Sequence, residues 1–151
     1  MAYRICKMIE IESGHMLSKH PANCKFPHGH SRKIEILLEA DTLDKNDMVC
    51  DFAILKELMK NFLNNFDHAL CINTSDPMYD TLKKAYGERI IGFEKQDPTT
   101  EVVAKLIFDK IKENLDAYCK HPKISFPIAT SVRLKRVRVW ETSTSWAEYE
   151  E

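Results

Sequence analysis

Apolar and polar residues alternate along two segments near the start of the chain. In the first, the odd positions are Ile5, Lys7, Ile9 and Ile11, and the even positions are Cys6, Met8, Glu10 and Glu12. In the second, the apolar residues at every other position are Ile34, Ile36, Leu38 and Ala40. A period of two predicts a strand with one buried face. We therefore expect two strands joined by a loop over Ser13–His30.

Two longer segments show helical spacing. Asp51 is a good N-cap for the first helix, and Pro98, which follows Asp97, suits the first turn of the second. The apolar stripes expected to face a sheet are Phe52, Leu55, Leu58, Met59, Phe62 and Leu63 in the first helix, and Val103, Leu106, Ile107, Lys110, Ile111 and Leu115 in the second. Between the two helices the periodicity is weak, and a short helix is expected over Met78–Tyr86.

The C-terminal part returns to strand patterns. His121–Ala129 contains two prolines and predicts a loop, whereas Val132–Glu141 and Ser145–Tyr149 predict strands. The alternation slips near Lys135–Arg136, which indicates a β-bulge. The element order is then ββααββ in a single domain spanning residues 1–151. This order predicts an α+β fold, with a four-stranded antiparallel sheet and two long helices on one face.

The opposite face of such a sheet would have no helices to cover it. Leu37 and Val137 or Val139 stand at strand positions that could be apolar on this face. A subunit of this kind often covers an open apolar face by associating with further copies of itself. We therefore expect a homo-oligomer.

Composition narrows the class of protein. The chain has 151 residues, 44% hydrophobic and 30% charged, as is typical of one soluble globular domain. Its net charge of -1 gives no support for a nucleic-acid or membrane partner. Five cysteines without the spacing of a disulfide framework fit a reducing compartment. No long apolar run or signal-peptide pattern is present, so we expect a cytoplasmic protein.

The residues best suited to chemistry concentrate at positions 24–30, with the sequence CKFPHGH. In an extended strand His28 and His30 point to the same face, and His15 could complete a set of three nitrogens. Three protein ligands and an open position are typical of a catalytic zinc, whereas four ligands close a structural site. Cys24 is then a base beside the metal, a fourth ligand or an inert thiol. The histidine pair alone also fits an ordinary turn.

Two further positions carry carboxylates. Asp67-His68 follows the first helix, and a histidine beside a carboxylate can transfer protons near neutral pH. The alternative for this pair is a solvated loop. Glu141 ends a predicted strand, where a carboxylate could accept two N–H groups of a planar heterocycle or simply be exposed.

Together these segments resemble the 6-pyruvoyl-tetrahydropterin synthase family, and within it the bacterial 6-carboxytetrahydropterin synthase branch. The resemblance covers nearly the whole chain and rests on five motifs in the family's order. They are SGH at 13–15 with CKFPHGH at 24–30, MVCDF at 48–52, DH at 67–68, PTTE at 98–101 and VWET at 139–142. The chain departs from the family at Gly14 and Met16, where alanine and arginine are common, and in a longer segment over Ser75–Gln96.

The resemblance implies the tunnelling fold and a catalytic zinc. His15, His28 and His30 would hold Zn²⁺, with hydroxyl groups of the substrate completing its coordination. Cys24 would be the general base, favoured as a thiolate by the nearby cation.

The resemblance also implies how the substrate is bound. Asp67 and His68 would form a proton relay supplied by a neighbouring subunit of a trimer-based assembly, such as a hexamer. Glu141 would anchor the pterin ring, assisted by Thr99 and Thr100.

The substrate implied by the resemblance is 7,8-dihydroneopterin triphosphate. The carboxy branch converts it to 6-carboxy-5,6,7,8-tetrahydropterin, acetaldehyde and triphosphate for queuosine and 7-deazapurine biosynthesis. The 6-pyruvoyl branch eliminates triphosphate and keeps the side chain. The segment ETSTSWAEY from Glu141 onward resembles the carboxy branch, so we expect that product. The pyruvoyl product is one alternative, a different lyase or hydrolase reaction at the same zinc site is a second, and a non-catalytic zinc-stabilised oligomer with Cys24 as fourth ligand is a third.

Overall fold

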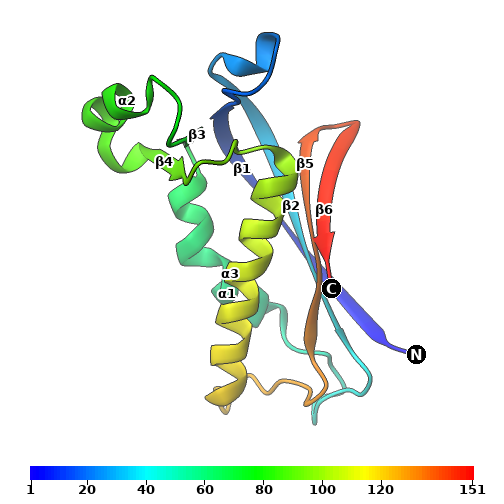
Figure 1. Ribbon diagram of the computed structural model, residues 1–151. Coiled ribbons are helices and arrows are strands. Elements are labelled where there is room, and N and C mark those ends of the chain that lie inside the picture. Colours follow the sequence, from blue (N-terminus) through cyan, green and yellow to red (C-terminus); the bar gives the residue numbers. More distant parts are fainter.

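The computed structural model describes residues 1–151. Its six-stranded sheet has the order β4-β3-β1-β2-β5-β6, and the long helices α1 and α3 cover one face of it (Figure 1). The strands are β1 Tyr3–Met16, β2 His28–Ala40, β3 Ala69–Asn73, β4 Ile90–Phe93, β5 Arg133–Thr142 and β6 Ser145–Glu150. The helices are α1 Phe52–Phe66, α2 Tyr79–Tyr86 and α3 Thr100–Lys120, with short 3-10 turns η1 Asn23–Lys25 and η2 Gly87–Arg89. The predicted α+β class is confirmed.

Strands β1 and β2 form a long antiparallel hairpin. Their register runs from Tyr3 opposite Ala40 to His15 opposite His28. The predicted alternation is confirmed, because the odd positions of β1 and most even positions of β2 are the more buried ones. The predicted loop over Ser13–His30 is wrong at both ends, since β1 and β2 remain paired as far as His15 and His28. Polar side chains occupy the inward positions there, so a hydrophobic pattern does not reveal them.

The sheet contains two strands that the sequence pattern did not reveal. Strand β3 pairs in parallel with β1, and β4 pairs in parallel with β3. The predicted four-stranded antiparallel sheet is therefore wrong in strand count, and the sheet is mixed. Five- and four-residue strands are too short to show a clear period. Because β3 starts directly after Asp67-His68, this pair lies beside β1.

The first helix begins where the sequence predicts. The Asp51 carboxylate accepts a hydrogen bond from the backbone N–H of Ala53 at 2.7 Å. The predicted apolar stripe is wrong at Phe52, which lies at its edge and is 51% exposed, whereas Ile54 and Phe66 are buried. The short helix α2 confirms the one expected over Met78–Tyr86.

The second long helix begins later than predicted. Thr99, rather than a residue before Pro98, is the N-cap, and its hydroxyl accepts from the backbone N–H of Val102 at 3.2 Å. Within the stripe, Leu106 is 39% exposed and Phe108 is fully buried instead. None of the helices combines the length and the apolar character that crossing a bilayer requires.

The predicted bulge and the two C-terminal strands are confirmed. Leu37 pairs with Arg136 and Leu38 with Leu134, so Lys135 is the extra residue. The bulge changes which positions face inward, and Val137 therefore lies in the core.

The sheet face without helices carries charged and apolar side chains together, and Leu37 lies on it as expected, half-buried, with the exposed Met8 and Trp146. Val137 and Val139 are both fully buried under the helices, so the expectation that they lie on the open face is wrong. Arg138 instead contacts Glu148 at 2.8 Å and Glu35 at 3.7 Å across neighbouring strands. An open face of this kind presents ion pairs to its surroundings.

Candidate metal centre and active site

Three histidines and one glutamate converge at one end of the sheet. His15 comes from β1, His28 and His30 from β2, and Glu141 from the end of β5. Their ligand atoms all lie within 4.8 Å of one another. The hairpin register explains the meeting, because His15 lies directly opposite His28, and His30 lies two residues further on the same face.

The spacing of these atoms fits a tetrahedral ion. His15 Nε2 lies 3.2 Å from His30 Nε2. Glu141 Oε1 lies 3.3 Å from His30 Nε2 and 3.7 Å from His15 Nε2. Ligands about 2.0–2.1 Å from a tetrahedral zinc are about 3.3 Å apart. The four groups can therefore hold a metal ion.

Backbone carbonyls fix which histidine nitrogen faces the group. His15 Nδ1 lies 2.8 Å from the Pro98 carbonyl oxygen, and His28 Nδ1 lies 2.8 Å from that of Phe26. A carbonyl only accepts, so each Nδ1 carries the proton and donates it. The Nε2 lone pairs of both rings are then available to an ion. Orientation of a metal-binding histidine by a hydrogen bond from its other nitrogen is the common arrangement.

Burial keeps the central histidine neutral. Burial outweighs the opposing effect of the Pro98 carbonyl and, together with the nearby Arg32 guanidinium, lowers the pKa of His15 to about 4. Burial also lowers the pKa of His30, again with a contribution from Arg32 that outweighs the opposing effect of Glu141. At neutral pH both imidazoles therefore offer lone pairs rather than protons.

Arg32 is a site residue that sequence reasoning missed. Its side chain is 1% exposed and forms no ion pair, and Nε has no hydrogen-bond partner. One terminal nitrogen donates to the hydroxyl of Thr100 at 3.0 Å, and the other lies 3.3 Å from His15 Nδ1. Its position in the sequence could have revealed it, because Arg32 follows His28 and His30 at the same two-residue spacing and therefore faces inward with them. Its charge favours the neutral form of the histidines.

Cys24 lies in the loop between the two strands that carry the histidines and is not a member of their group. The residue is half-buried and belongs to the turn η1, whose other residues, Asn23 and Lys25, are exposed. Its carbonyl accepts a hydrogen bond from the Leu17 N–H at 3.0 Å. The fourth member of the possible ligand group is Glu141 rather than this thiol.

The Asp67-His68 pair forms a separate constellation. Asp67 Oδ2 lies 3.0 Å from His68 Nδ1, and Asp67 Oδ1 accepts from the Glu12 N–H at 2.9 Å. The His68 backbone has a φ of 58° and donates to the Glu12 carbonyl at 2.7 Å, so a strained turn presents the ring. The His68 side chain is 71% exposed. Within one chain the pair is not part of the metal group.

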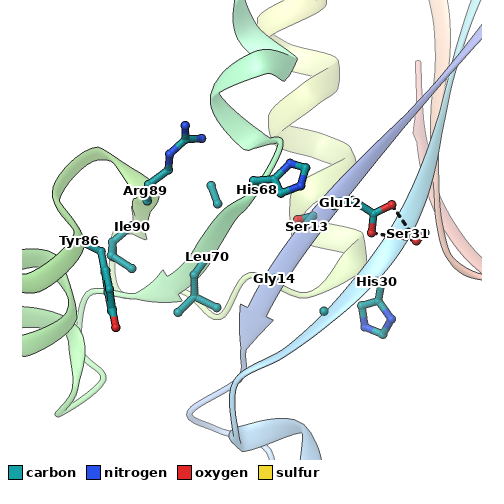
Figure 2. Close-up of a pocket in the computed structure, with 12 residues that line it drawn as sticks. Glu12, Ser13, Gly14, His30, Ser31, His68, Leu70, Tyr86, Arg89 and Ile90 are labelled. Carbon is teal, nitrogen blue, oxygen red and sulfur yellow. Dashed lines mark hydrogen bonds between the residues drawn. The ribbon is translucent and has the colours of Figure 1, made fainter.

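His68 borders a pocket of about 640 Å³. Figure 2 shows its ring above β1, while the His30 ring lies below β2. Tyr86 and Arg89, from the longer segment after β3, line the far side of this pocket. Arg89 also donates to the Asp67 carbonyl at 3.2 Å, which braces the turn that carries His68.

The hydroxyls of Thr99 and Thr100 are both engaged within the protein. That of Thr99 caps α3, and that of Thr100 accepts from Arg32. Thr100 is buried and Thr99 is half-buried. The Thr99 backbone is engaged as well, since its N–H donates to the Asp97 carbonyl and its carbonyl accepts from the Val103 N–H, both at 2.9 Å.

Comparison with known proteins identifies the family. The family model described as 6-pyruvoyl tetrahydropterin synthase matches residues 4–151. The chain therefore belongs to the 6-pyruvoyl tetrahydropterin synthase family. The resemblance found from the sequence motifs is confirmed.

Curated members of this family extend over the full chain. The 6-carboxy-5,6,7,8-tetrahydropterin synthase of Aquifex aeolicus is 33% identical over 169 aligned residues, covering 100% of this chain and 99% of that protein. The synthase of the same name from Bacillus subtilis is 30% identical, covering 98% of this chain and 85% of that protein. These relatives indicate an enzyme family that acts on pterins.

Solved structures support the tunnelling fold. An uncharacterized protein from Wolinella succinogenes has a TM-score of 0.79 at 20% identity, covering 100% of this chain and 99% of that one. The 6-pyruvoyl tetrahydropterin synthase of Plasmodium vivax has a TM-score of 0.70 at 18% identity, covering 100% and 98%. The family's fold is thus shared over the entire chain.

Proposed function

We propose that this protein is a zinc-dependent 6-carboxy-5,6,7,8-tetrahydropterin synthase. It would convert 7,8-dihydroneopterin triphosphate to 6-carboxy-5,6,7,8-tetrahydropterin, acetaldehyde and triphosphate, in the cytoplasm, for queuosine biosynthesis. The observation that carries the proposal is the group of His15, His28, His30 and Glu141 in a chain whose full-length relatives have this name.

The donor set suits zinc. Neutral imidazole nitrogens are preferred zinc ligands, and His15 and His28 present Nε2 lone pairs held in place by backbone carbonyls. Bound Zn²⁺ would act as a Lewis acid that makes the side-chain hydroxyls of the substrate more acidic. The three histidines would hold the ion and leave room for these hydroxyls, if Glu141 turns to the substrate.

In this proposal Cys24 removes a proton from the substrate side chain. Its loop adjoins the histidine group, and its thiol is not needed as a ligand. Asp67 and His68 form a proton relay, in which the carboxylate orients the imidazole ring. Because His68 is exposed and lies outside the metal group of its own chain, we propose that it completes the site of a neighbouring subunit.

We propose that Glu141 binds the pterin ring. Its side chain is 34% exposed and borders a pocket of about 700 Å³ that also contacts His30, Trp140 and Thr142. A carboxylate there can accept two parallel hydrogen bonds from the adjacent N–H groups of a pterin. The ring would then lie beside the metal group, with Thr99 and Thr100 assisting at the start of α3.

Product analysis tests the proposed function. Incubation with 7,8-dihydroneopterin triphosphate should give the mass of the carboxylated tetrahydropterin, together with acetaldehyde. The 6-pyruvoyl product is the second candidate, because the matching family model has that description. Absence of any turnover by zinc-loaded protein would contradict both and favour the non-catalytic zinc-stabilised oligomer.

Replacement of Glu141 tests the pterin contact. In Glu141→Gln the side chain keeps its size but loses its charge and one acceptor. Hydrogen bonds to charged groups contribute about 1.5–3 kcal/mol, so pterin affinity should fall about 10- to 100-fold. Isothermal titration with a pterin gives the affinity, and metal analysis should show unchanged zinc content.

Glu148→Gln is the matched control, because Glu148 lies on the open face in an ion pair with Arg138. It should bind pterin with unchanged affinity. Unchanged affinity in Glu141→Gln would show that the ring is bound elsewhere. Loss of zinc from that variant would show that Glu141 is a metal ligand.

A further inference from the structure

A buried carboxylate joins the loop that carries Cys24 to the rest of the protein. Asp97, which is 6% exposed, precedes α3. Its Oδ1 accepts from the Ser18 hydroxyl at 2.7 Å and from Asn73 Nδ2 at 2.9 Å. Its Oδ2 accepts from the Lys19 backbone N–H at 2.8 Å. One side chain therefore connects the loop after β1 to the end of β3.

The Asp97 side chain accepts the hydrogen bonds that join this loop to segments outside the β1–β2 hairpin. The other hydrogen bonds of residues 17–27 are internal to the loop or run to His28 at its end. Ser18 and Lys19 directly follow Leu17, whose N–H donates to the Cys24 carbonyl at 3.0 Å. Asp97 is thus connected to Cys24 in two steps. Its carboxylate is hydrogen-bonded to Ser18 and Lys19, and the preceding residue, Leu17, is hydrogen-bonded to Cys24.

The same segment also holds the metal group. Pro98, the next residue, accepts from His15 Nδ1 at 2.8 Å, and Thr99 then caps α3. Asp97 and Pro98 therefore set the place of the Cys24 loop and of His15 relative to one another. Their own position is fixed by the start of a long helix packed on the sheet.

The hydrogen bonds that Asp97 accepts are strong because its carboxyl group is charged. Burial raises the pKa of this carboxyl, but the hydrogen bonds from Asn73, Lys19 and Ser18 outweigh burial and hold the pKa below its usual range. The group is thus a carboxylate at neutral pH, and hydrogen bonds to a carboxylate are shorter and stronger than those between neutral groups.

We propose that Asp97 is a positioning residue that fixes the Cys24 loop against the histidine group. This inference rests on the proposed role of Cys24 as the base. Asp97 does not contact the histidines itself and acts through Ser18 and Lys19. A displacement of about 1 Å in a catalytic group can reduce a rate about 10²-fold, so a loop without this connection should lose activity while the metal remains.

Three variants and one control test the proposal. Asp97→Ala removes all three hydrogen bonds. Asp97→Asn keeps one acceptor oxygen for Ser18 and Asn73 but turns an amide N–H₂ toward the Lys19 N–H. Ser18→Ala changes one exposed residue of the loop. The control, Asp109→Ala, removes an exposed α3 carboxylate that pairs with Lys105.

The first readout needs no substrate. Limited alkylation with iodoacetamide, followed by peptide mass analysis, gives the modification of Cys24 relative to the exposed Cys6 of the same molecule. The ratio should rise by about threefold or more in Asp97→Ala, because local opening exposes the thiol. The increase should be smaller in Asp97→Asn and Ser18→Ala and absent in Asp109→Ala.

The second readout is catalytic. In Asp97→Ala kcat should fall about 10- to 100-fold with KM changed less than about threefold, and Asp97→Asn should recover part of the loss. Zinc content should equal that of the unchanged protein. Loss of zinc from folded Asp97→Ala would overturn the proposal, because Asp97 would then support the histidine group instead of the loop.

An unchanged alkylation ratio in folded Asp97→Ala would also overturn the proposal. If that variant does not fold, an unchanged ratio in both Asp97→Asn and Ser18→Ala overturns it. Failure of the proposed function has a different signature. The unchanged protein would then not act on 7,8-dihydroneopterin triphosphate, while the alkylation ratio would still report whether Asp97 fixes the loop.

Discussion

Cys24→Ala should abolish turnover of 7,8-dihydroneopterin triphosphate while the protein keeps its zinc. The thiol lies outside the group formed by the three histidines and Glu141, so its removal takes away no ligand. Loss of a general base typically reduces a rate about 10²- to 10⁴-fold. Steady-state kinetics and metal analysis of the same preparation measure both properties.

Cys6→Ala is the matched control for this experiment. Cys6 is an exposed thiol on β1, far along the strand from the histidines. Its removal should leave rate and zinc content unchanged. Loss of zinc from Cys24→Ala would identify the thiol as a structural ligand, and an unchanged rate would exclude it as the base.

Mixed assemblies of two inactive variants should recover activity. Cys24→Ala and His68→Ala chains each lack one part of the site, and the exposed ring of His68 is proposed to serve a neighbouring subunit. After joint dissociation and reassembly, about one quarter of the sites would contain both intact residues by random pairing. The rate of the mixture, compared with that of each variant treated alone, measures this recovery.

The control mixture combines unchanged protein with a chain that carries both Cys24→Ala and His68→Ala. About one quarter of its sites should also be intact. Mixed oligomers that form but stay inactive in the first experiment would show that Cys24 and His68 act in one chain. The Asp67-His68 pair would then act through the pocket that His68 and His30 of the same chain both line.

Much of the site could be predicted because alternation fixes the face on which a side chain lies. His28 and His30 are two residues apart, and hairpin pairing brings His15 opposite the first of them. The bulge at Lys135 was also visible, since one extra residue shifts the apolar positions of β5. These features follow from local geometry and need no knowledge of distant contacts.

Other features depend on contacts that no local pattern contains. Strands β3 and β4 are short, and the pairing of β3 with β1 and of β4 with β3 is set by the packing of the whole sheet. Arg32 stands in a polar run, and its burial arises only because β2 turns that position under α3. Asp97 looked like part of a helix start, whereas its hydrogen bonds join three segments far apart in the sequence.

The composition of the open face changes one premise of the predicted assembly. Of the apolar residues expected there, Leu37 lies on that face, but Val137 and Val139 lie in the core, and ion pairs of Arg138 share the face. The proposal of a homo-oligomer now rests on a different argument, namely that the Asp67-His68 pair is exposed and is not a member of the metal group of its own chain. The mixing experiment tests this argument.

The most direct test of the central claim is a product assay with controlled metal content. Protein stripped by a chelator, the same protein restored with zinc, and a His28→Ala variant are each incubated with 7,8-dihydroneopterin triphosphate, and products are identified by mass. We predict 6-carboxy-5,6,7,8-tetrahydropterin from the restored protein alone, and reduced zinc binding in His28→Ala. Equal product formation by the stripped protein, or full zinc content with full activity in His28→Ala, would contradict the account.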